Sequence, residues 1–329
     1  MFIPWNHPSV TLTGRWSRGE DSHTSTTNNG SRVEFAFTGS LATLHFDLST
    51  NTDPAPRLWV SVDGGAMVDV TVNPFVKINA GDEGAHIGKA IVKASSEAQA
   101  RWFAPQEAVV RFVGIEADGS ADLPEDSRKI IEFVGDSITE GVLIDPDHGN
   151  PENFQDRVFA DDSCATYAWL TATKLGMRPR IIGYGGVGTT KSGSGDVPPV
   201  QISYPQVYDG CEAQEESADV IVINHGSNDA GAPDEAFTEG YTKLLEVIRS
   251  MNKTSRIFAI SPFYGGKEEV LPKIVDAFNA ANSDDITFIS TKGWLPPDPI
   301  HPLRDGHQRA SELLTDALAH ELACQRPSA

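Results

Sequence analysis

The sequence predicts two domains, an N-terminal all-β sandwich of jelly-roll type and a C-terminal α/β domain with three layers around a parallel sheet. A chain of 329 residues is longer than one compact hydrophobic core usually extends, which favours two domains. Short segments with a period of two fill the first part, whereas apolar segments alternate with helical patterns in the second. We place the sandwich at residues 1–122 and the α/β domain at residues 128–329.

In the first part, apolar and polar residues alternate in short runs at 32–37, 42–48, 58–62 and 109–113. This pattern is typical of strands that bury one face. Turn sequences rich in Gly and Asp, such as Asp63-Gly64-Gly65, separate the runs. The sequence shows no convincing amphipathic helix in this part, so we expect an antiparallel sandwich.

A polar stretch at 118–126, interrupted by Gly and Pro, is the expected linker between the domains. After it, apolar runs predict strands at 130–134, 180–182, 220–223, 256–260 and 286–289. Helical patterns follow at 164–175, 234–251, 267–282 and 306–323. Apolar strands separated by helices indicate a parallel sheet that is covered on both faces. Ligands bind such sheets beyond the carboxyl ends of the strands, where we expect the functional site.

The first strand of the second domain leads directly into Gly135-Asp136-Ser137. We therefore expect Ser137 at a strand-to-helix turn, at the edge of the sheet, with its hydroxyl available. A serine in this place could also simply cap a helix. To act as a nucleophile, it needs an imidazole that takes its proton and a carboxylate that holds the imidazole.

A proline-rich loop at 294–302 contains Asp298 and His301, which can supply the carboxylate and the imidazole. The alternative is that both are exposed loop residues without a catalytic role. A second pair, Asp305 and His307, follows a few residues later. There we expect Asp305 to cap the last helix and His307 to lie in its first turn.

Acyl transfer also requires hydrogen-bond donors for the oxyanion, and two loops that follow strands offer them. The loop 183–190 is rich in glycine, which lets backbone amides approach a ligand, and the loop 224–229 contains the side-chain amide of Asn228. Each loop could also be an ordinary connection. A phosphate site in the glycine loop is disfavoured, because the loop lacks the Lys-Ser/Thr pair of a P-loop.

Taken together and in this order, the Gly-Asp-Ser, glycine-loop, Gly-x-Asn-Asp and Asp-x-x-His blocks resemble the SGNH (GDSL-like) hydrolases. The resemblance covers about residues 129–323. It implies Ser137 as the nucleophile, His301 as the base and Asp298 as the carboxylate partner of His301. It also implies an oxyanion hole made by the Ser137 amide, Gly188 and Asn228.

The choice of Gly188 rests on the spacing Gly183-x-Gly185-x-x-Gly188, which follows the Asn-x-Gly-x-x-Gly of the family. Gly183 stands where the family usually has asparagine. Gly185 or Gly186 could face the site instead, so the sequence leaves this donor open.

A jelly roll, a short linker and a Gly-Asp-Ser strand together resemble the family-two carbohydrate esterases, and residues 13–16 are similar to their opening. The resemblance implies a serine esterase, specifically a carbohydrate acetyl esterase that removes O-acetyl groups from sugars or oligosaccharides through an acyl-enzyme. Trp294 and Trp102 are candidates for stacking on the sugar, although packing would also explain them. Two alternatives remain: a lipase or thioesterase acting on longer acyl chains, and a carbohydrate-binding protein with an inactive hydrolase domain.

The composition of the chain disfavours several classes of partner and of binding site. A net charge of −20 and a pI near 4.7 make nucleic acids and anionic membranes poor partners. The partner that the resemblance implies is a small-molecule or oligosaccharide ester. No stretch approaches the roughly 20 apolar residues of a membrane-spanning helix. The three cysteines lie far apart and the acidic residues and histidines are scattered, so we expect no disulfide, no metal and no cofactor.

The compartment and the assembly are less defined. The start of the chain lacks a basic segment followed by an apolar core, which predicts a cytoplasmic protein, or a secreted one if a leader has been removed. The sequence leaves the oligomeric state open, a homo-oligomer included. Residues 144–162, rich in Asp, Pro and Asn, form an insertion close to Ser137 that we expect to shape the pocket or a subunit contact.

Overall fold

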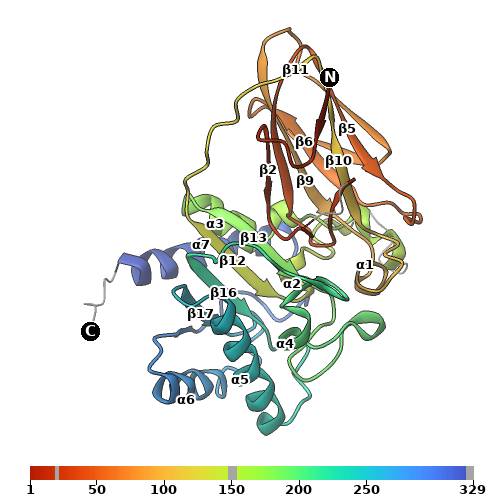
Figure 1. Cartoon of the computed structure of the whole chain (residues 1–329). Helices are drawn as coiled ribbons and strands as arrows, with labels where there is room; N and C mark the ends of the chain where they lie inside the picture. Colours follow the sequence, from red (N-terminus) through yellow and green to blue (C-terminus); the bar gives the residue numbers. More distant parts are fainter. Residues whose placement is uncertain (19–21, 147–153, 324–329) are drawn as a thin grey trace.

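The computed structural model describes residues 1–18, 22–146 and 154–323. Two domains stack end to end, with the β-rich N-terminal domain above the α/β domain in Figure 1. The expected fold class, a jelly-roll sandwich followed by an α/β domain with a parallel sheet, is confirmed. Within the described part of the chain, no helix is long and apolar enough to cross a membrane.

The N-terminal domain consists of two antiparallel sheets. One has the strand order β1-β10-β5-β8 with β3 beside β10, and the other has the order β11-β4-β9-β6-β7 with β2 beside β4. The strands are β1 (Phe2–Pro4), β2 (Val10–Thr13), β3 (Thr24–Thr26), β4 (Arg32–Thr38), β5 (Leu41–Asp47), β6 (Arg57–Val62), β7 (Val68–Thr71), β8 (Phe75–Asn79), β9 (Ala85–Ala94), β10 (Val110–Glu116) and β11 (Gly119–Ser120).

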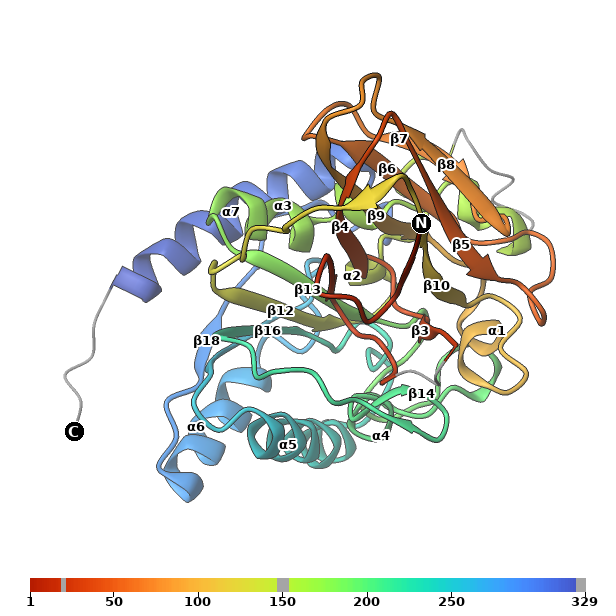
Figure 2. The same ribbon diagram turned by 45° about the horizontal axis from the view of Figure 1, so that its top comes forward.

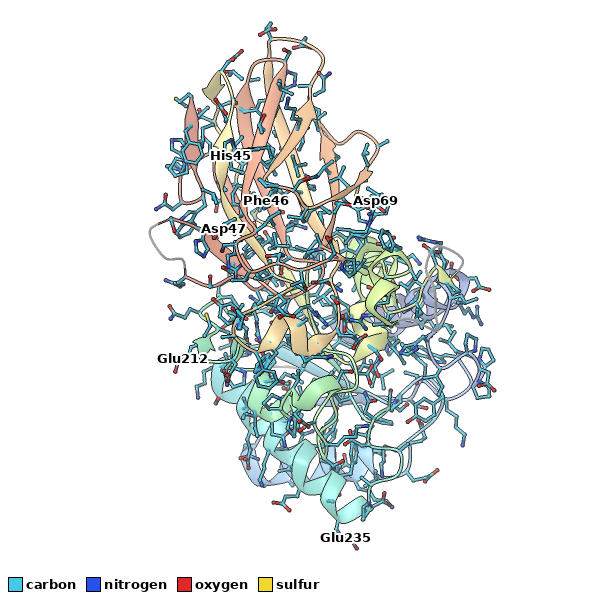
Figure 3. The ribbon with its side chains drawn as sticks, turned by 90° about the vertical axis from the view of Figure 1, so that its right-hand side faces the viewer. His45, Phe46, Asp47, Asp69, Glu212 and Glu235 are labelled. Atoms are coloured by element: carbon cyan, nitrogen blue, oxygen red, sulfur yellow. The ribbon has the colours of Figure 1, made fainter. Side chains whose placement is uncertain are left out.

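Alternating burial along the strands explains why this sequence forms a sandwich. Figure 3 labels three successive residues of β5, of which Phe46 is buried while His45 and Asp47 are half-buried. Side chains from both sheets, such as Phe35 and Phe112, meet in one apolar cluster between them. This cluster is the core of the sandwich.

The connection between β9 and β10 contains a short helix, α1 (Ala98–Trp102), that the sequence did not predict. Ala98 and Trp102 pack into the core of the α/β domain. Trp102 is 0% exposed, and its ring meets the ring of Tyr184 edge-on with 5.3 Å between centroids. The candidate role of Trp102 in stacking on a sugar is therefore wrong, because no face of its ring is accessible. It joins the two domains instead.

A five-stranded parallel sheet with the order β13-β12-β16-β17-β18 forms the centre of the second domain. Its strands are β12 (Ile130–Gly135), β13 (Arg178–Gly183), β16 (Val220–Asn224), β17 (Arg256–Ile260) and β18 (Thr287–Ile289), and a separate ribbon pairs β14 (Gln206–Tyr208) with β15 (Cys211–Glu212). A strand is present at each of the positions expected from the apolar runs.

Helices cover both faces of this sheet, as Figure 2 shows. Helices α3 (Tyr167–Lys174) and α7 (Arg304–Ala323) pack on one face, and α4 (Val200–Ser203), α5 (Asp234–Met251) and α6 (Leu271–Asn282) pack on the other. One further helix, α2 (Ser137–Glu140), follows β12 directly. The domain therefore has the three layers expected from the alternation of strands and helices.

The register of the sheet brings three loops together. Gly135 at the end of β12 lies opposite Gly183 of β13 on one side and Asn224 of β16 on the other. Since the strands are parallel, the loops that follow them leave the same edge of the sheet. The Gly-Asp-Ser block, the glycine loop and the loop with Asn228 thus begin side by side.

The linker between the domains runs from β11 to β12 along the outside of the molecule in Figure 1. Of the insertion at 144–162, residues 147–153 lie outside the described residues. The described remainder includes a 3-10 helix (Phe154–Phe159), which carries Arg157. The role expected for this insertion stays a prediction.

Candidate active site

Ser137 is the first residue of α2, a single helical turn that begins directly after β12. The residue before it, Asp136, caps this helix, because its Oδ1 accepts a hydrogen bond from the amide of Ile138 at 3.0 Å. Gly141 ends the helix with a φ of 95°, a conformation that glycine adopts at little cost. The Ser137 side chain therefore lies at the carboxyl edge of the sheet, where it lines a cavity.

His301 is the hydrogen-bond partner of Ser137. Its Nε2 lies 2.9 Å from Oγ of Ser137, although the two residues are 164 positions apart in the sequence. Burial lowers the pKa of His301 below its usual 6.5, the positive charge of Arg157 lowers it further, and Glu140 opposes this shift. A lowered pKa keeps the imidazole neutral at neutral pH, which is the form that accepts the proton of a nucleophile.

Asp298 lines the same cavity, but its side chain is exposed to solvent. Within the described residues, no hydrogen bond or ion pair joins Asp298 to His301. The two lie in one loop, yet the structure lacks the contact that an orienting carboxylate makes with its imidazole. The geometry therefore does not support Asp298 as the third member of a triad, and mutagenesis is needed to test this role.

The second pair of candidates has a structural role. His307 is fully buried in α7, where its Nδ1 accepts a hydrogen bond from the amide of Tyr167 at 3.0 Å and its ring stacks on the Tyr167 ring. Burial lowers the pKa of His307 to about 3, so this imidazole stays neutral. Asp305 lies in the first turn of α7, not at its cap, because the helix begins at Arg304. Neither side chain contacts Ser137.

Asn228 lines the same cavity as Ser137. Its Nδ2 donates hydrogen bonds to the backbone oxygen of Val187 at 3.1 Å and to Oδ2 of Asp136 at 3.2 Å. These bonds connect the loop that carries Asn228 with the glycine loop and with the cap of α2. Both N–H groups of this amide are in use, so donation to an oxyanion replaces one of the two bonds.

Gly188 does not have the geometry expected of an oxyanion donor. Its amide donates to the backbone oxygen of Lys191 at 3.2 Å, and Gly188 is not among the described residues that line the cavity. A Cβ atom at Gly188 would lie 2.7 Å from Oδ1 of Asp229, so this glycine permits close packing of the two loops. The preference for Gly188 over its neighbours is therefore not supported.

Gly185, unlike Gly188, lies next to Ser137 in the wall of the cavity. It lines the cavity, and a Cβ atom at Gly185 would lie 3.9 Å from Cβ of Ser137 and 3.4 Å from Nη1 of Arg157. In the described part of the chain, no hydrogen bond occupies the Gly185 amide. The Ser137 amide, as the first amide of a helix, also has no partner within its helix. These two amides and the Asn228 side chain are therefore the candidate donors to an oxyanion at Ser137.

The cavity has a volume of about 830 Å³, which is typical of small-molecule sites. Most of its wall comes from the loops at the carboxyl edge of the sheet. Glu97 and Gln99, however, come from the segment around α1 in the N-terminal domain. Both domains therefore form the wall of the cavity.

Tyr264 and Arg157 are among the polar residues of the cavity that sequence reasoning missed. The Tyr264 hydroxyl donates to the backbone oxygen of Ser227 at 3.0 Å, and burial raises the pKa of Tyr264 to about 12. Tyr264 follows β17, and its place after a parallel strand is the signal that could have identified it. Arg157 lies in the insertion expected near Ser137 and is buried, but no sequence pattern distinguishes it from the other arginines of the chain.

Trp294, the other tryptophan expected to meet a sugar, packs against the protein. Its ring stacks near that of Phe263 with 6.4 Å between centroids, and it is partly buried against the core under α3 and α7. It is not among the described residues that line the cavity. Of the aromatic residues described here, Tyr264 is the one in the wall of the cavity.

Across the residues that the structure describes, no group of His, Cys, Asp and Glu side chains is arranged to hold a metal ion. Cys164 and Cys211 are free thiols, and Cys324 lies outside the described residues. Burial raises the pKa of the Cys164 thiol well above its usual value, so it is not a reactive nucleophile. The chemistry that the cavity supports is that of the Ser137 hydroxyl and the His301 imidazole.

Comparison with known proteins gives a family match to the catalytic part of the chain. The GDSL-like Lipase/Acylhydrolase family matches residues 133–309. Among curated proteins, the chain is similar to the cellulase/esterase CelE of Acetivibrio thermocellus, with 25% identity over 349 residues. That alignment covers 96% of this chain but 40% of the relative, so the chain spans less than half the length of CelE.

Solved structures match both domains together. A family two carbohydrate esterase from Clostridium thermocellum in complex with cellohexaose has a TM-score of 0.77 at 22% identity and covers 95% of this chain and 99% of its own. The family two carbohydrate esterase from Cellvibrio japonicus has a TM-score of 0.79 at 17% identity, with 97% of each chain covered. The acetyl xylan esterase Est2A from Butyrivibrio proteoclasticus has a TM-score of 0.77 at 18% identity, with 98% of each chain covered. The arrangement of sandwich and α/β domain is thus shared with these proteins.

Proposed function

This chain belongs to the GDSL-like lipase/acylhydrolase family, and from that premise we propose that it is a serine esterase that removes O-acetyl groups from sugars or oligosaccharides. The observation that carries the proposal is the 2.9 Å contact between Oγ of Ser137 and Nε2 of His301. Both atoms belong to side chains that line a cavity large enough for a small ester. Nucleophile and base are therefore already within hydrogen-bond distance.

In the proposed reaction, His301 takes the Ser137 proton at Nε2 while Oγ attacks the carbonyl carbon of the ester. The Ser137 amide, the Gly185 amide and the Asn228 side chain would donate to the oxyanion. His301 then gives its proton to the leaving sugar oxygen, and an acetyl-enzyme remains. Water then attacks the acetyl carbonyl carbon while His301 takes one of its protons. As the bond from the acetyl group to Oγ breaks, His301 gives that proton to Oγ, which releases acetate and restores the Ser137 hydroxyl.

The wall beside Ser137 supports a short acyl group. Ile138 and Val142 line the cavity and are each 2% exposed. Because they are packed tightly, the cavity has little freedom to widen at this wall. A methyl group suits an apolar wall of this kind. The alternative, a lipase or thioesterase acting on longer acyl chains, would need this wall to rearrange.

Polar groups elsewhere in the cavity support a sugar as the leaving group. Gln99, Ser194 and Tyr264 line it and offer donors and acceptors to hydroxyl groups. The similar protein from Butyrivibrio is named an acetyl xylan esterase, and the one from Clostridium was solved with cellohexaose. These names motivate the substrate class proposed here. The second alternative, a carbohydrate-binding protein with an inactive hydrolase domain, is disfavoured by the contact between Ser137 and His301.

The substrate class is tested by measuring the acetate released from acetylated xylo- and manno-oligosaccharides. The kcat/KM for these substrates is then compared with the kcat/KM for p-nitrophenyl esters of increasing acyl chain length. We expect acetylated oligosaccharides to be the better substrates and the rate to fall steeply beyond short acyl chains. Ser137→Ala serves as the blank for each substrate. Faster release of long acyl chains, or hydrolysis of p-nitrophenyl acetate without any release of acetate from sugars, would refute the substrate class.

A further inference from the structure

Glu140 is a buried carboxylate that holds the helix of the nucleophile. It is the last residue of α2, which begins with Ser137, and its side chain is 0% exposed. Its Oε1 accepts hydrogen bonds from Arg101 at 2.6 Å, from Arg157 at 2.5 Å and from Asn29 at 3.5 Å. The Oε2 atom has no hydrogen-bond partner among the described residues. One oxygen atom therefore receives all the contacts that fix this carboxylate.

Two of these partners come from the N-terminal domain. Arg101 belongs to α1, at the end of the sandwich that faces the α/β domain (Figure 1). Its side chain is 0% exposed, its Nη1 donates to the backbone oxygen of Thr27 at 2.9 Å, and its guanidinium lies 5.1 Å from the centre of the Tyr184 ring. The bond to Thr27 holds Arg101 on the sandwich side, the Tyr184 ring contacts it from the α/β domain, and its Nη2 reaches Glu140.

Arg157 binds the same oxygen of this carboxylate and also connects the domains. Its Nη2 donates to Glu140 and to the backbone oxygen of Ser96, and its Nε pairs with Glu97 at 3.2 Å and with Asp161 at 3.4 Å. Arg157 lines the cavity, whereas Arg101 does not. Arg101 therefore acts on Glu140 without any contact of its own with the substrate space.

The short length of α2 makes these contacts important. A helix of one turn is not stable by itself, because its nucleation cost is not recovered by further hydrogen bonds. Its direction is fixed at the start by Asp136, whose Oδ1 accepts from the amide of Ile138, and at the end by Glu140. A shift of Glu140 would turn the helix and move the Ser137 hydroxyl relative to His301.

We propose that Arg101 of the sandwich domain is a positioning residue for Ser137, acting through Glu140 and α2. This inference rests on the proposed function, because it takes Ser137 as the nucleophile. The jelly roll then completes the catalytic unit, since the α/β domain alone lacks one of the two charged groups that fix the nucleophile's helix. Loss of Arg101 would leave the buried carboxylate paired with Arg157 only and free to move toward it.

Arg15 provides a matched control. It is also a buried arginine of the sandwich domain that pairs with a glutamate of the α/β domain, with its Nε 2.6 Å from Oε1 of Glu215 and its side chain 1% exposed. It also donates to the backbone oxygen of Tyr204. Neither Arg15 nor Glu215 lines the cavity or contacts α2. Arg15→Met therefore removes a similar contact between the domains at a distance from Ser137.

The test compares Arg101→Met with Arg15→Met in the full chain by three measurements: the rate of fluorophosphonate labelling of Ser137, kcat and KM for p-nitrophenyl acetate, and the thermal unfolding midpoint. We expect Arg101→Met to lower kcat and the labelling rate by about 100-fold with little change in KM, as a displaced nucleophile does. Arg15→Met should change both rates by less than about threefold while lowering the unfolding midpoint. Arg101→Lys, which keeps a charge near Glu140, should recover part of the lost rate.

Near wild-type labelling of a folded Arg101→Met protein would overturn the proposal, and so would an equal loss of rate in Arg15→Met. If Arg101→Met does not fold, Arg101→Lys and Glu140→Gln decide the question, because each should lower kcat without raising KM. Equal rates of these variants and wild type would then contradict it. Ser137→Ala separates this inference from the proposed function: persistent labelling of that variant would refute the nucleophile itself, whatever the arginine variants do.

Discussion

Asn228 donates a hydrogen bond from Nδ2 to Oδ2 of Asp136, the residue that caps the helix of Ser137, over 3.2 Å. The third loop of the site is therefore held against the first before any ligand binds. Burial raises the pKa of Asp136 to about 6, so this carboxylate is largely ionised at neutral pH and is a good acceptor for the amide. The contact holds the Asn228 amide in the wall of the cavity that Ser137 also lines.

We expect Asn228→Ala to lower kcat for p-nitrophenyl acetate by about 10²- to 10³-fold with little effect on KM, because a donor to the oxyanion is lost. Steady-state kinetics measures this change. Asn252→Ala is the control, since Asn252 is a buried asparagine that donates to Tyr204 and Ile248 away from the cavity. Equal losses of kcat in both variants would mean that Asn228 acts only through stability.

Two variants of the glycine loop test whether Gly185 or Gly188 donates its amide to the oxyanion. A Cβ atom at Gly185 meets no atom closer than 3.4 Å, so Gly185→Ala should fold normally yet place a methyl group beside Ser137 and lower kcat by about 10-fold. At Gly188 the Cβ atom would lie 2.7 Å from the Asp229 carboxylate, so Gly188→Ala should cost about 1–3 kcal/mol of stability. Kinetics and thermal unfolding measure the two effects. The opposite pattern would restore Gly188 as the donor.

The choice between these glycines shows where the sequence stops predicting the site. The order of the blocks and their place at the edge of the sheet followed from the apolar strands and were confirmed by the register of Gly135 with Gly183 and Asn224. The direction of a single amide depends on the path of the loop, which here is fixed by a bond from the Ser194 amide to the Gly185 oxygen. No residue pattern encodes that bond.

The sequence also did not predict the contacts between the domains. Arg101 and Glu140 are charged residues of the kind usually found in solvent. Their burial is tolerable because Arg101, 39 positions away, and Arg157 both pair with the Glu140 carboxylate. Trp102 was expected to face a ligand because it is aromatic, whereas the fold uses it to fill a core formed mostly by the other domain. Helix α6 begins at Leu271 and not at Lys267, because Lys267 has a φ of 59°, which a helix does not accommodate.

Asp298 is tested by Asp298→Asn. A carboxylate that holds a catalytic imidazole is worth up to about 10⁴-fold in kcat, but Asp298 is exposed and makes no contact with His301 among the described residues. We therefore expect kcat for p-nitrophenyl acetate to fall by less than about 10-fold, far less than in His301→Ala. A loss as large as that of His301→Ala would show that Asp298 reaches His301 during the reaction.

The pH dependence of kcat/KM follows from the environment of His301. Burial and the charge of Arg157 lower the pKa of His301 below 6.5, and only the neutral imidazole takes the Ser137 proton. Activity should therefore persist as pH falls through 6.5 and decline only below it. A pH profile with p-nitrophenyl acetate, with the labelling rate of Ser137 as a second readout, measures the acidic limb. A midpoint at or above the usual value would contradict the lowered pKa of His301.

The central claim is that Ser137 is the nucleophile, activated by His301 at 2.9 Å. The most direct measurement is the reaction of the full chain with a fluorophosphonate, followed by the intact mass and by peptide mapping of the adduct. We predict a single adduct on Ser137, none in Ser137→Ala and a strongly reduced rate of formation in His301→Ala. An adduct on another residue, or undiminished labelling of Ser137→Ala, would contradict the account.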